Sequence, residues 1–318
     1  MQPLQANEIV GNWATLLLPI DENDDINYEK LSDEIDILIA AEVNGIYSNG
    51  TAGEFYNQTE KEFDKINLLL AEKCNAANMP FQIGCSHPDP RLSLGRLKRA
   101  IKLYPSAVQI ILPDWVSPSM DEIITYLKVM SDTAAVIGLV LYNPPHAKKL
   151  LTPEDFYQIQ QAGIKLVGCK VGGGDKVWYN KMKKLVPELS LFVPGHHLAT
   201  GIGLGAAGAY SNVACLNPKV AQRWYEMMPD DIDAALELES RIQFFMQTQI
   251  VPYIQGGKYS NTAADKFLAA VGGWAYIGTR LRWPYKSIPF QDVERVRESA
   301  RKILPEFFDD SMNLNLKN

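Results

Sequence analysis

Short runs of β-branched and apolar residues alternate with longer segments of helical period along most of this chain. The alternation is typical of parallel strands joined by helices, because two adjacent parallel strands need a long crossover between them. Eight such runs precede Pro218, and eight is the number of strands in a (β/α)8, or TIM, barrel. The expected strands are residues 13–18, 45–48, 81–85, 107–112, 136–141, 166–170, 191–193 and 209–211.

Helix start signals stand between these runs. A hydroxyl side chain followed three residues later by a carboxylate forms a capping box, in which each side chain satisfies the other's backbone amide. The chain has three such pairs ahead of apolar stripes: Thr59 with Glu62, Ser119 with Glu122, and Thr152 with Asp155. We also expect Asp175 to cap the helix that follows the sixth strand.

After Pro218 the alternation stops and only segments of helical period follow. We expect helices at residues 221–228, 232–247, 262–271 and 291–303. The predicted architecture is α/β, with a catalytic (β/α)8 barrel over residues 8–230, a helical region over 231–306 and a polar tail over 307–318. An open doubly wound sheet is the alternative, but the Gly-x-Gly-x-x-Gly turn that usually follows its first strand is missing.

Composition excludes several classes of protein. The 318 residues contain 31 basic and 37 acidic side chains, a formal net charge of −6. No basic block is dense enough to follow a phosphate backbone, so we expect no nucleic-acid partner. No apolar run approaches the roughly 18 residues of a membrane-spanning helix, and the first residues lack a signal-peptide pattern. We therefore expect a soluble, cytoplasmic protein with no membrane partner.

Lys170 is the anomaly of the predicted core, since it ends the apolar run at residues 166–170. An isolated ammonium away from water costs several kcal/mol, and burial lowers the pKa of an amine. A lysine placed in this way can be partly neutral near pH 7 and can attack a carbonyl to form a Schiff base. The alternative is a lysine that reaches the surface just past the strand end.

Other residues follow the strand ends, where the active site of a parallel barrel lies. The second strand runs into a turn at residues 49–55, in which Gly50 permits a tight bend and the Thr51 hydroxyl and backbone amides can hold a carboxylate. Tyr142 ends the fifth strand. Alternation along neighbouring strands places Tyr142 and Lys170 at the barrel mouth. An amine, a phenol and an anion-holding turn together predict an active site, with a structural turn and a buried tyrosine as the alternatives.

Histidines are expected to follow the third, fifth and seventh strands, at His87, His146 and His196. Convergent histidines can bind a metal, but no His-x-His spacing is present, and we predict no metal and no other cofactor. We expect these histidines to hydrogen-bond the variable half of a substrate; solvated loop histidines are the alternative. The four cysteines show no Cys-x-x-Cys pair, which favours reduced thiols in the core.

Four short motifs occur in a specific order and spacing. They are Gly-Thr-x-Gly-Glu at 50–54, Tyr-Asn-x-Pro at 142–145, Gly-x-Lys at 168–170 and the glycine-rich turn at 205–211. Over most of residues 8–230 the chain thus resembles the dihydrodipicolinate synthase / N-acetylneuraminate lyase family of class I, Schiff-base-forming pyruvate aldolases. The resemblance implies that Lys170 forms the Schiff base, that Tyr142 is the acid/base, and that Thr51 and the Ala52 amide hold a 2-oxo acid carboxylate. It also implies a homo-oligomer, a tetramer or a dimer.

The chain departs from the family pattern at several places. Ala52 replaces the second threonine of the turn, and Trp115 stands where the synthases have a tyrosine that relays protons. Ala147 stands where they have an arginine for the carboxylate of the aldehyde, and lysines nearby lack its bidentate fork. His196 and His197 stand where the sialic acid lyases have acidic residues. The predicted substrate-binding residues are Gly50, Thr51, Ala52, Trp115, His146, His196 and Tyr210.

The predicted function is a lyase that forms or cleaves a 2-oxo acid from pyruvate and an aldehyde other than aspartate semialdehyde. A polyhydroxylated or aromatic aldehyde suits the histidines and Trp115 better. The alternatives are a dehydratase of a sugar-derived 2-keto acid and a true 4-hydroxy-tetrahydrodipicolinate synthase. A barrel that binds a small acid without catalysis is a further alternative.

Overall fold

The computed structural model describes residues 1–308, and residues 309–318 of the predicted tail lie outside this range. The strands close into one parallel barrel in the order β1 to β8. This confirms the predicted (β/α)8 fold. The strands are β1 (Gly11–Thr15), β2 (Gly45–Ser48), β3 (Phe81–Gly84), β4 (Ala107–Ile111), β5 (Leu139–Asn143), β6 (Leu166–Val171), β7 (Ser190–Pro194) and β8 (Gly208–Tyr210).

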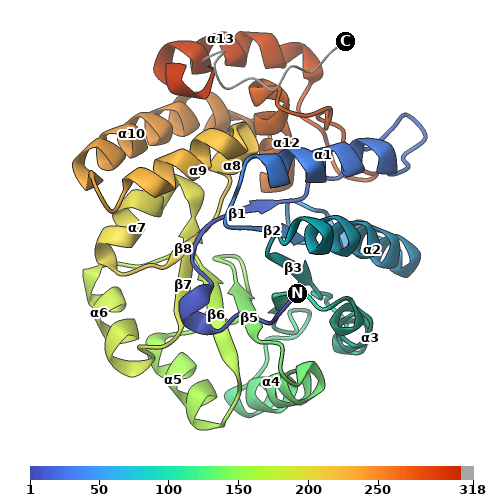
Figure 1. The fold of residues 1–318 in the computed structure, drawn as a ribbon, viewed down its shortest axis with the longest axis vertical. Helices are drawn as coiled ribbons and strands as arrows, with labels where there is room; N and C mark the ends of the chain where they lie inside the picture. Colours follow the sequence, from blue (N-terminus) through green and yellow to red (C-terminus); the bar gives the residue numbers. More distant parts are fainter. Residues whose placement is uncertain (309–318) are drawn as a thin grey trace.

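Helices surround the barrel and gather more densely beside β1 and β8 (Figure 1). The helices that follow successive strands are α1 (Tyr28–Ala40), α2 (Glu60–Ala77), α3 (Pro90–Ala100), α4 (Met120–Ala134), α5 (Pro153–Gln161), α6 (Lys176–Leu185), α7 (Leu198–Leu204) and α8 (Val213–Leu216). The C-terminal region adds α9 (Pro218–Met227), α10 (Ile232–Phe245), α11 (Val251–Gln255), α12 (Asn261–Gly272) and α13 (Val293–Ile303). A π-helical turn, Met246–Ile250, joins α10 to α11.

The predicted caps are confirmed. Thr59, Ser119 and Thr152 each accept a hydrogen bond from the amide three residues later, and the capping boxes are complete. Asp175 accepts from the Trp178 amide at 2.8 Å and begins α6. Within residues 1–308, no helix is both long enough and apolar enough to cross a bilayer.

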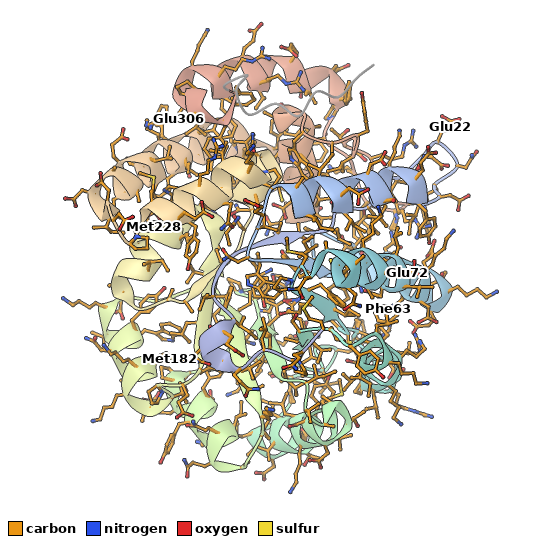
Figure 2. The ribbon with its side chains drawn as sticks, in the orientation of Figure 1. Glu22, Phe63, Glu72, Met182, Met228 and Glu306 are labelled. Carbon is orange, nitrogen blue, oxygen red and sulfur yellow. The ribbon has the colours of Figure 1, made fainter. Side chains whose placement is uncertain are left out.

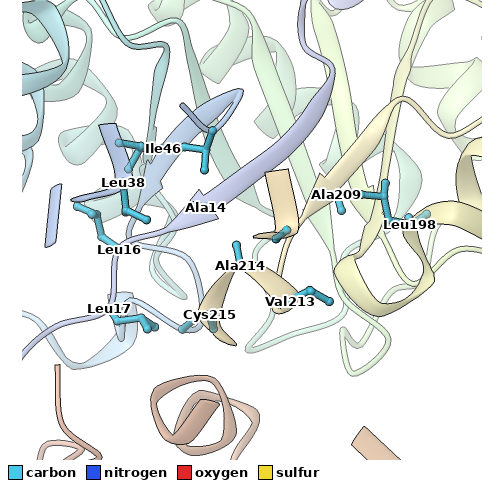
Figure 3. Close-up of a cluster of buried hydrophobic side chains, with 14 of the residues drawn as sticks. Ala14, Leu16, Leu17, Leu38, Ile46, Leu198, Ala209, Val213, Ala214 and Cys215 are labelled. Carbon is cyan, nitrogen blue, oxygen red and sulfur yellow. The ribbon is translucent and has the colours of Figure 1, made fainter. Parts of the chain in front are cut away.

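Two strand predictions were displaced by two residues or more. The first strand ends at Thr15, and the apolar residues after it pack against α8 outside the barrel, where Figure 3 shows Leu16 and Leu17 near Ala214 and Cys215. The fifth strand begins at Leu139, because Val136 is 69% exposed and precedes the ladder. It extends through Tyr142 into the rim.

The core has two parts. The larger lies between the strands and the helices, where Phe63 of α2 and Met182 of α6 are buried (Figure 2). The smaller fills the barrel interior and contains Trp13, Tyr47 and Tyr210 among its residues. A packed interior leaves room for a ligand only at the mouth of the barrel.

The pairing of β5 with β6 contains an irregularity that sets the site. Leu139 pairs with Leu166 but Val140 pairs with Gly168, so Val167 is an extra residue and turns into the interior cluster. The alternation of side chains along the sixth strand is therefore broken between Leu166 and Gly168. Above this break, Tyr142 pairs directly with Lys170, as the alternation of the last residues requires.

Candidate active site

Lys170 lies at the barrel mouth, among three aromatic rings. Its Nζ is 4.3 Å from the ring centroid of Tyr142 and 5.3 Å from those of Tyr47 and Tyr210. Ring faces attract an ammonium, but they offer no anion to pair with it. Lys170 is half-buried and lines a cavity, so the alternative of a surface lysine past the strand end does not describe it.

The cavity at Lys170 has a volume of about 370 Å³. Tyr142, Thr51, Ala52, His146, His196 and Tyr210 all contribute to its lining. Its outer wall comes from the C-terminal region, through Met246, Ile250 and residues of α12. We call this space the lysine cavity. It brings together the predicted catalytic pair and all but two of the predicted substrate-binding residues, Gly50 and Trp115.

Gly50 and Glu54 shape the turn after β2. A Cβ on Gly50 would lie 2.6 Å from the Tyr47 ring, so only glycine lets the turn pass so close to this ring. Glu54 adopts a left-handed conformation with φ of 53° and is buried. Its carboxylate accepts from Lys266 Nζ at 2.7 Å and from the Arg282 amide at 3.2 Å. The buried ion pair between Glu54 and Lys266 therefore fixes the turn that carries Thr51 against α12.

Trp115 lies apart from Lys170, on a second, apolar cavity of about 310 Å³. The side chain of Trp115 is 83% exposed, and Lys148 Nζ lies 5.2 Å from its ring centroid. The walls of this apolar cavity include Phe55, Ile111 and Leu112. The two cavities share Thr51, Tyr142 and His146 as lining residues. A ligand held at Lys170 can therefore extend an apolar group past Tyr142.

His196 is the only one of the predicted histidines with a defined partner inside the lysine cavity, among the residues that the structure describes. Asn212 Nδ2 donates to His196 Nδ1 at 2.9 Å, and the His196 amide donates to Asn212 Oδ1 at 3.2 Å. Burial, aided by the neighbouring His197, lowers the pKa of His196 to about 4. His196 is therefore a neutral hydrogen-bonding group at pH 7.

The remaining predicted residues differ in whether they can contact a ligand in the cavities. His146 is exposed at the rim of both cavities. His87 lines neither of them, and its Nδ1 accepts from the Asp89 amide at 2.9 Å instead. The Tyr210 hydroxyl donates to Gln82 Oε1 at 2.7 Å below the mouth, so Tyr210 offers its ring rather than its hydroxyl. Across residues 1–308 no group of three His, Cys, Asp or Glu side chains is placed to hold a metal.

Sequence reasoning missed Tyr47 and Asp265, both of which line the lysine cavity. Period-two alternation in the second strand would have placed Tyr47 inside the barrel. Asp265 lies on α12, in a region expected only to be helical, and no motif marks it. Burial raises the pKa of Asp265 to about 7 against the opposing effect of Lys170.

The fold and the site together define a class of protein: a (β/α)8-barrel enzyme with an amine at the mouth of the barrel. The chain belongs to the dihydrodipicolinate synthetase family, whose model matches residues 8–260. It is a Schiff-base-forming carbon–carbon lyase of the class I aldolase type, which agrees with the family that its sequence motifs indicated.

Similar proteins differ in their reactions. The trans-O-hydroxybenzylidenepyruvate hydratase-aldolase of Sphingobium xenophagum is 23% identical over 94% of both chains. The 4-hydroxy-tetrahydrodipicolinate synthase of Coxiella burnetii is 27% identical over 66% of this chain and 71% of its own length. The N-acetylneuraminate lyase of Rhizobium meliloti is 21% identical over 93% of this chain and 96% of its own.

Solved structures share the fold. A prophage protein of the dihydrodipicolinic acid synthase family from E. coli K12, in complex with pyruvate, superimposes with a TM-score of 0.81. It covers 93% of this chain and 98% of that chain, at 18% identity. The sialic acid aldolase of Ruminococcus gnavus gives a TM-score of 0.80 at 18% identity, over 94% and 98% of the two chains.

Proposed function

We propose that this lyase forms or cleaves a 2-oxo acid whose aldehyde half carries an aromatic or other apolar group. The observation that supports this substrate class is the apolar cavity, which adjoins the lysine cavity at Tyr142. Phe55, Ile111 and Trp115 on its walls favour an apolar ring over a charged chain. The similar hydratase-aldolase, named for a hydroxybenzylidene pyruvate, is consistent with this substrate class.

In the proposed mechanism Lys170 is the nucleophile. The lone pair of Nζ attacks C2 of the 2-oxo acid, and loss of water gives an iminium. The Tyr142 phenol gives its proton to the departing water, which leaves a phenolate. When the C3–C4 bond breaks, its electron pair forms the C2=C3 bond of the enamine and the iminium π pair returns to nitrogen. The C4 hydroxyl gives its proton to the Tyr142 phenolate, and C4 leaves as the carbonyl carbon of the aldehyde. Tyr142, whose ring lies 4.3 Å from Nζ, moves protons during the formation and hydrolysis of the imine. Thr51 and the Ala52 amide hold the carboxylate of the substrate.

Aspartate semialdehyde is a poor candidate for the aldehyde half. Ala147 provides no guanidinium fork for its carboxylate, and the two lysines that follow, which line the apolar cavity, are each held by another group of the protein. Lys148 Nζ donates to the Trp115 carbonyl, and Lys149 Nζ lies 3.5 Å from the Asp155 carboxylate. A missing charge-assisted contact costs about 1.5–3 kcal/mol, or roughly tenfold to over a hundredfold in affinity.

A polyhydroxylated aldehyde is the second candidate. Neutral His196 and Asn212 give the lysine cavity a polar wall, which offers hydrogen bonds to hydroxyl groups. A 2-keto sugar acid bound on this wall could also undergo dehydration through the same imine. The two substrate classes therefore use different walls of the site.

A substrate panel tests the proposal. Purified protein is given pyruvate with aromatic aldehydes, with sugar aldehydes and with aspartate semialdehyde, and the 2-oxo acid product is measured. We expect the aromatic aldehydes to give the highest kcat/KM, and Trp115→Ala to lower that value more than the value for sugar aldehydes. Turnover of aspartate semialdehyde alone at about 10⁴ M⁻¹s⁻¹ or above would instead indicate a synthase.

We further propose that the protein is a cytoplasmic homo-oligomer, a tetramer or a dimer. The support is the family resemblance together with the composition of the chain. Light scattering on a size-exclusion column measures the mass in solution, and a mass of one 35.5 kDa chain would contradict the proposed assembly.

A further inference from the structure

Asp265 reaches the lysine cavity from a fixed helix. Residues three or four apart share a helix face, and Asn261, Ala264 and Asp265 of α12 all line this cavity. The next residue, Lys266, is buried against Glu54, and Thr262 Oγ1 donates to the Thr51 carbonyl at 3.0 Å. These contacts hold α12 across the mouth, so the orientation of Asp265 is set by the fold.

The carboxylate of Asp265 has no fixed partner. No hydrogen bond reaches it from any other residue between 1 and 308, although the side chain is half-buried. The charge of Asp265 interacts electrostatically with four groups: Lys170 on β6, Tyr47 on β2, Cys215 on α8 and Tyr56 in the 3-10 turn Phe55–Asn57. Even a half-buried carboxylate is costly when no group of the fold donates a hydrogen bond to it, and such groups are concentrated at functional sites.

The proposed reaction needs a base close to Lys170. An iminium of pyruvate becomes a nucleophile only when it loses a proton from C3, and the exposed Trp115 cannot accept one. We propose that Asp265 is the base that removes and returns the C3 proton of pyruvate bound to Lys170. This inference rests on the proposed Schiff-base function of Lys170 and adds a second proton-transfer group to Tyr142.

The step balances without a further reactant. The C3–H electron pair forms the C2=C3 bond, and the C=N π electrons return to the nitrogen of Lys170. The proton passes to the Asp265 carboxylate, which gives a neutral enamine and a carboxylic acid. Reprotonation at C3 reverses each change, and in heavy water the returning hydron is deuterium.

The test needs only pyruvate, so it does not depend on the aldehyde. Loss of the methyl proton signal of pyruvate in heavy water measures C3 exchange, and borohydride trapping measures the imine. We expect Asp265→Asn to slow exchange by roughly 10²–10⁴-fold while Lys170 is still trapped. Asp132→Asn, at an exposed position on α4, removes the same charge elsewhere and should exchange as the wild type does.

The pH dependence gives a second readout. Exchange by the wild type should rise through about pH 7 as Asp265 ionises, and this rise should be absent in Asp265→Asn. Burial raises the pKa values of Tyr47 and Cys215 well above their usual values and that of Tyr56 to about 12, and the pKa of His196 is about 4. None of these groups titrates near pH 7, so none of them accounts for the expected rise.

Two outcomes would overturn the role proposed for Asp265, and a third would overturn the Schiff-base function on which it rests. Exchange by Asp265→Asn within a few-fold of the wild type would mean that another group is the base. Parallel loss of trapping and exchange would mean that Asp265 positions Lys170 instead of moving the C3 proton. A wild type that shows neither trapping nor exchange would contradict the Schiff-base function itself.

Discussion

Lys170 is surrounded by three aromatic rings, and the carboxylate of Asp265 interacts with it electrostatically. Of the three rings, that of Tyr142 lies closest to Lys170 Nζ, and Tyr142 pairs directly with Lys170 between β5 and β6. The backbone pairing therefore fixes the phenol beside the amine. This proximity supports the assignment of Tyr142 to proton transfer at the imine.

Tyr142→Phe should keep the barrel intact and slow imine formation by roughly 10²–10⁴-fold, because the ring stays and only the hydroxyl is lost. Borohydride added at timed intervals after pyruvate measures the rate. Tyr276→Phe is a matched control, since Tyr276 is 56% exposed and lines neither cavity. A Tyr142→Phe rate within a few-fold of the wild type would assign the proton transfer to another group.

His196 gives a prediction on stability. Its pKa is about 4 in the fold against 6.5 in an ordinary environment, so below pH 6.5 the unfolded chain takes up a proton that the folded one does not. The stabilisation is present above pH 6.5 and is lost as the pH falls towards 4. Urea unfolding at several pH values should show this decline for the wild type and a shallower one for His196→Asn.

Asparagine can still accept the Asn212 hydrogen bond, so His196→Asn changes the titration more than the packing. The control is His146→Asn, which removes an exposed histidine at the rim of the cavity. An unchanged pH slope in His196→Asn would mean that other groups cause the decline.

At the scale of elements, α12 connects the C-terminal region to the active site. Lys266 and Glu54 form an ion pair at 2.7 Å with no exposed surface on either side chain, and it joins α12 to the turn after β2. Removing one partner of such a pair leaves an uncompensated charge, whereas removing both relieves that charge. The pair therefore makes the position of Thr51 depend on residues more than 200 positions away.

Lys266→Met should lower the free energy of unfolding by about 3–5 kcal/mol, because it leaves the Glu54 carboxylate buried without its cation. The double variant Glu54→Gln/Lys266→Met should recover much of that loss. Urea unfolding measures both. Lys181→Met breaks the exposed pair with Glu154 and should cost less than about 1 kcal/mol. Equal losses in the two single variants would contradict the buried pair as an anchor.

The strands and caps were predictable where local pattern decides them. The predicted strand at 45–48 and the capping box at Thr59 are both confirmed, since each depends on a few adjacent residues. The start of the fifth strand and the bulge at Val167 were not predicted, because pairing between strands decides both. Asp265 was missed because helical periodicity does not tell which face of an appended helix covers the barrel mouth.

At the scale of the molecule, the barrel brings residues from distant parts of the sequence into one site. The carboxyl ends of β2, β5 and β6 supply Thr51, Tyr142 and Lys170, and α12 covers them from one side. Their convergence was predictable because a closed barrel gathers all strand ends at one rim. The apolar and polar walls of the site were not predictable from the sequence, because they depend on loop conformations and on the C-terminal helices.

The most direct test of the account is borohydride reduction in the presence of pyruvate, followed by peptide mass analysis. We predict one pyruvate adduct per chain, located on the peptide that contains Lys170, and no adduct in Lys170→Ala. Circular dichroism should show that the variant keeps its fold, because the half-buried amine contributes little packing. An adduct on another lysine, or unchanged trapping in Lys170→Ala, would contradict the central claim.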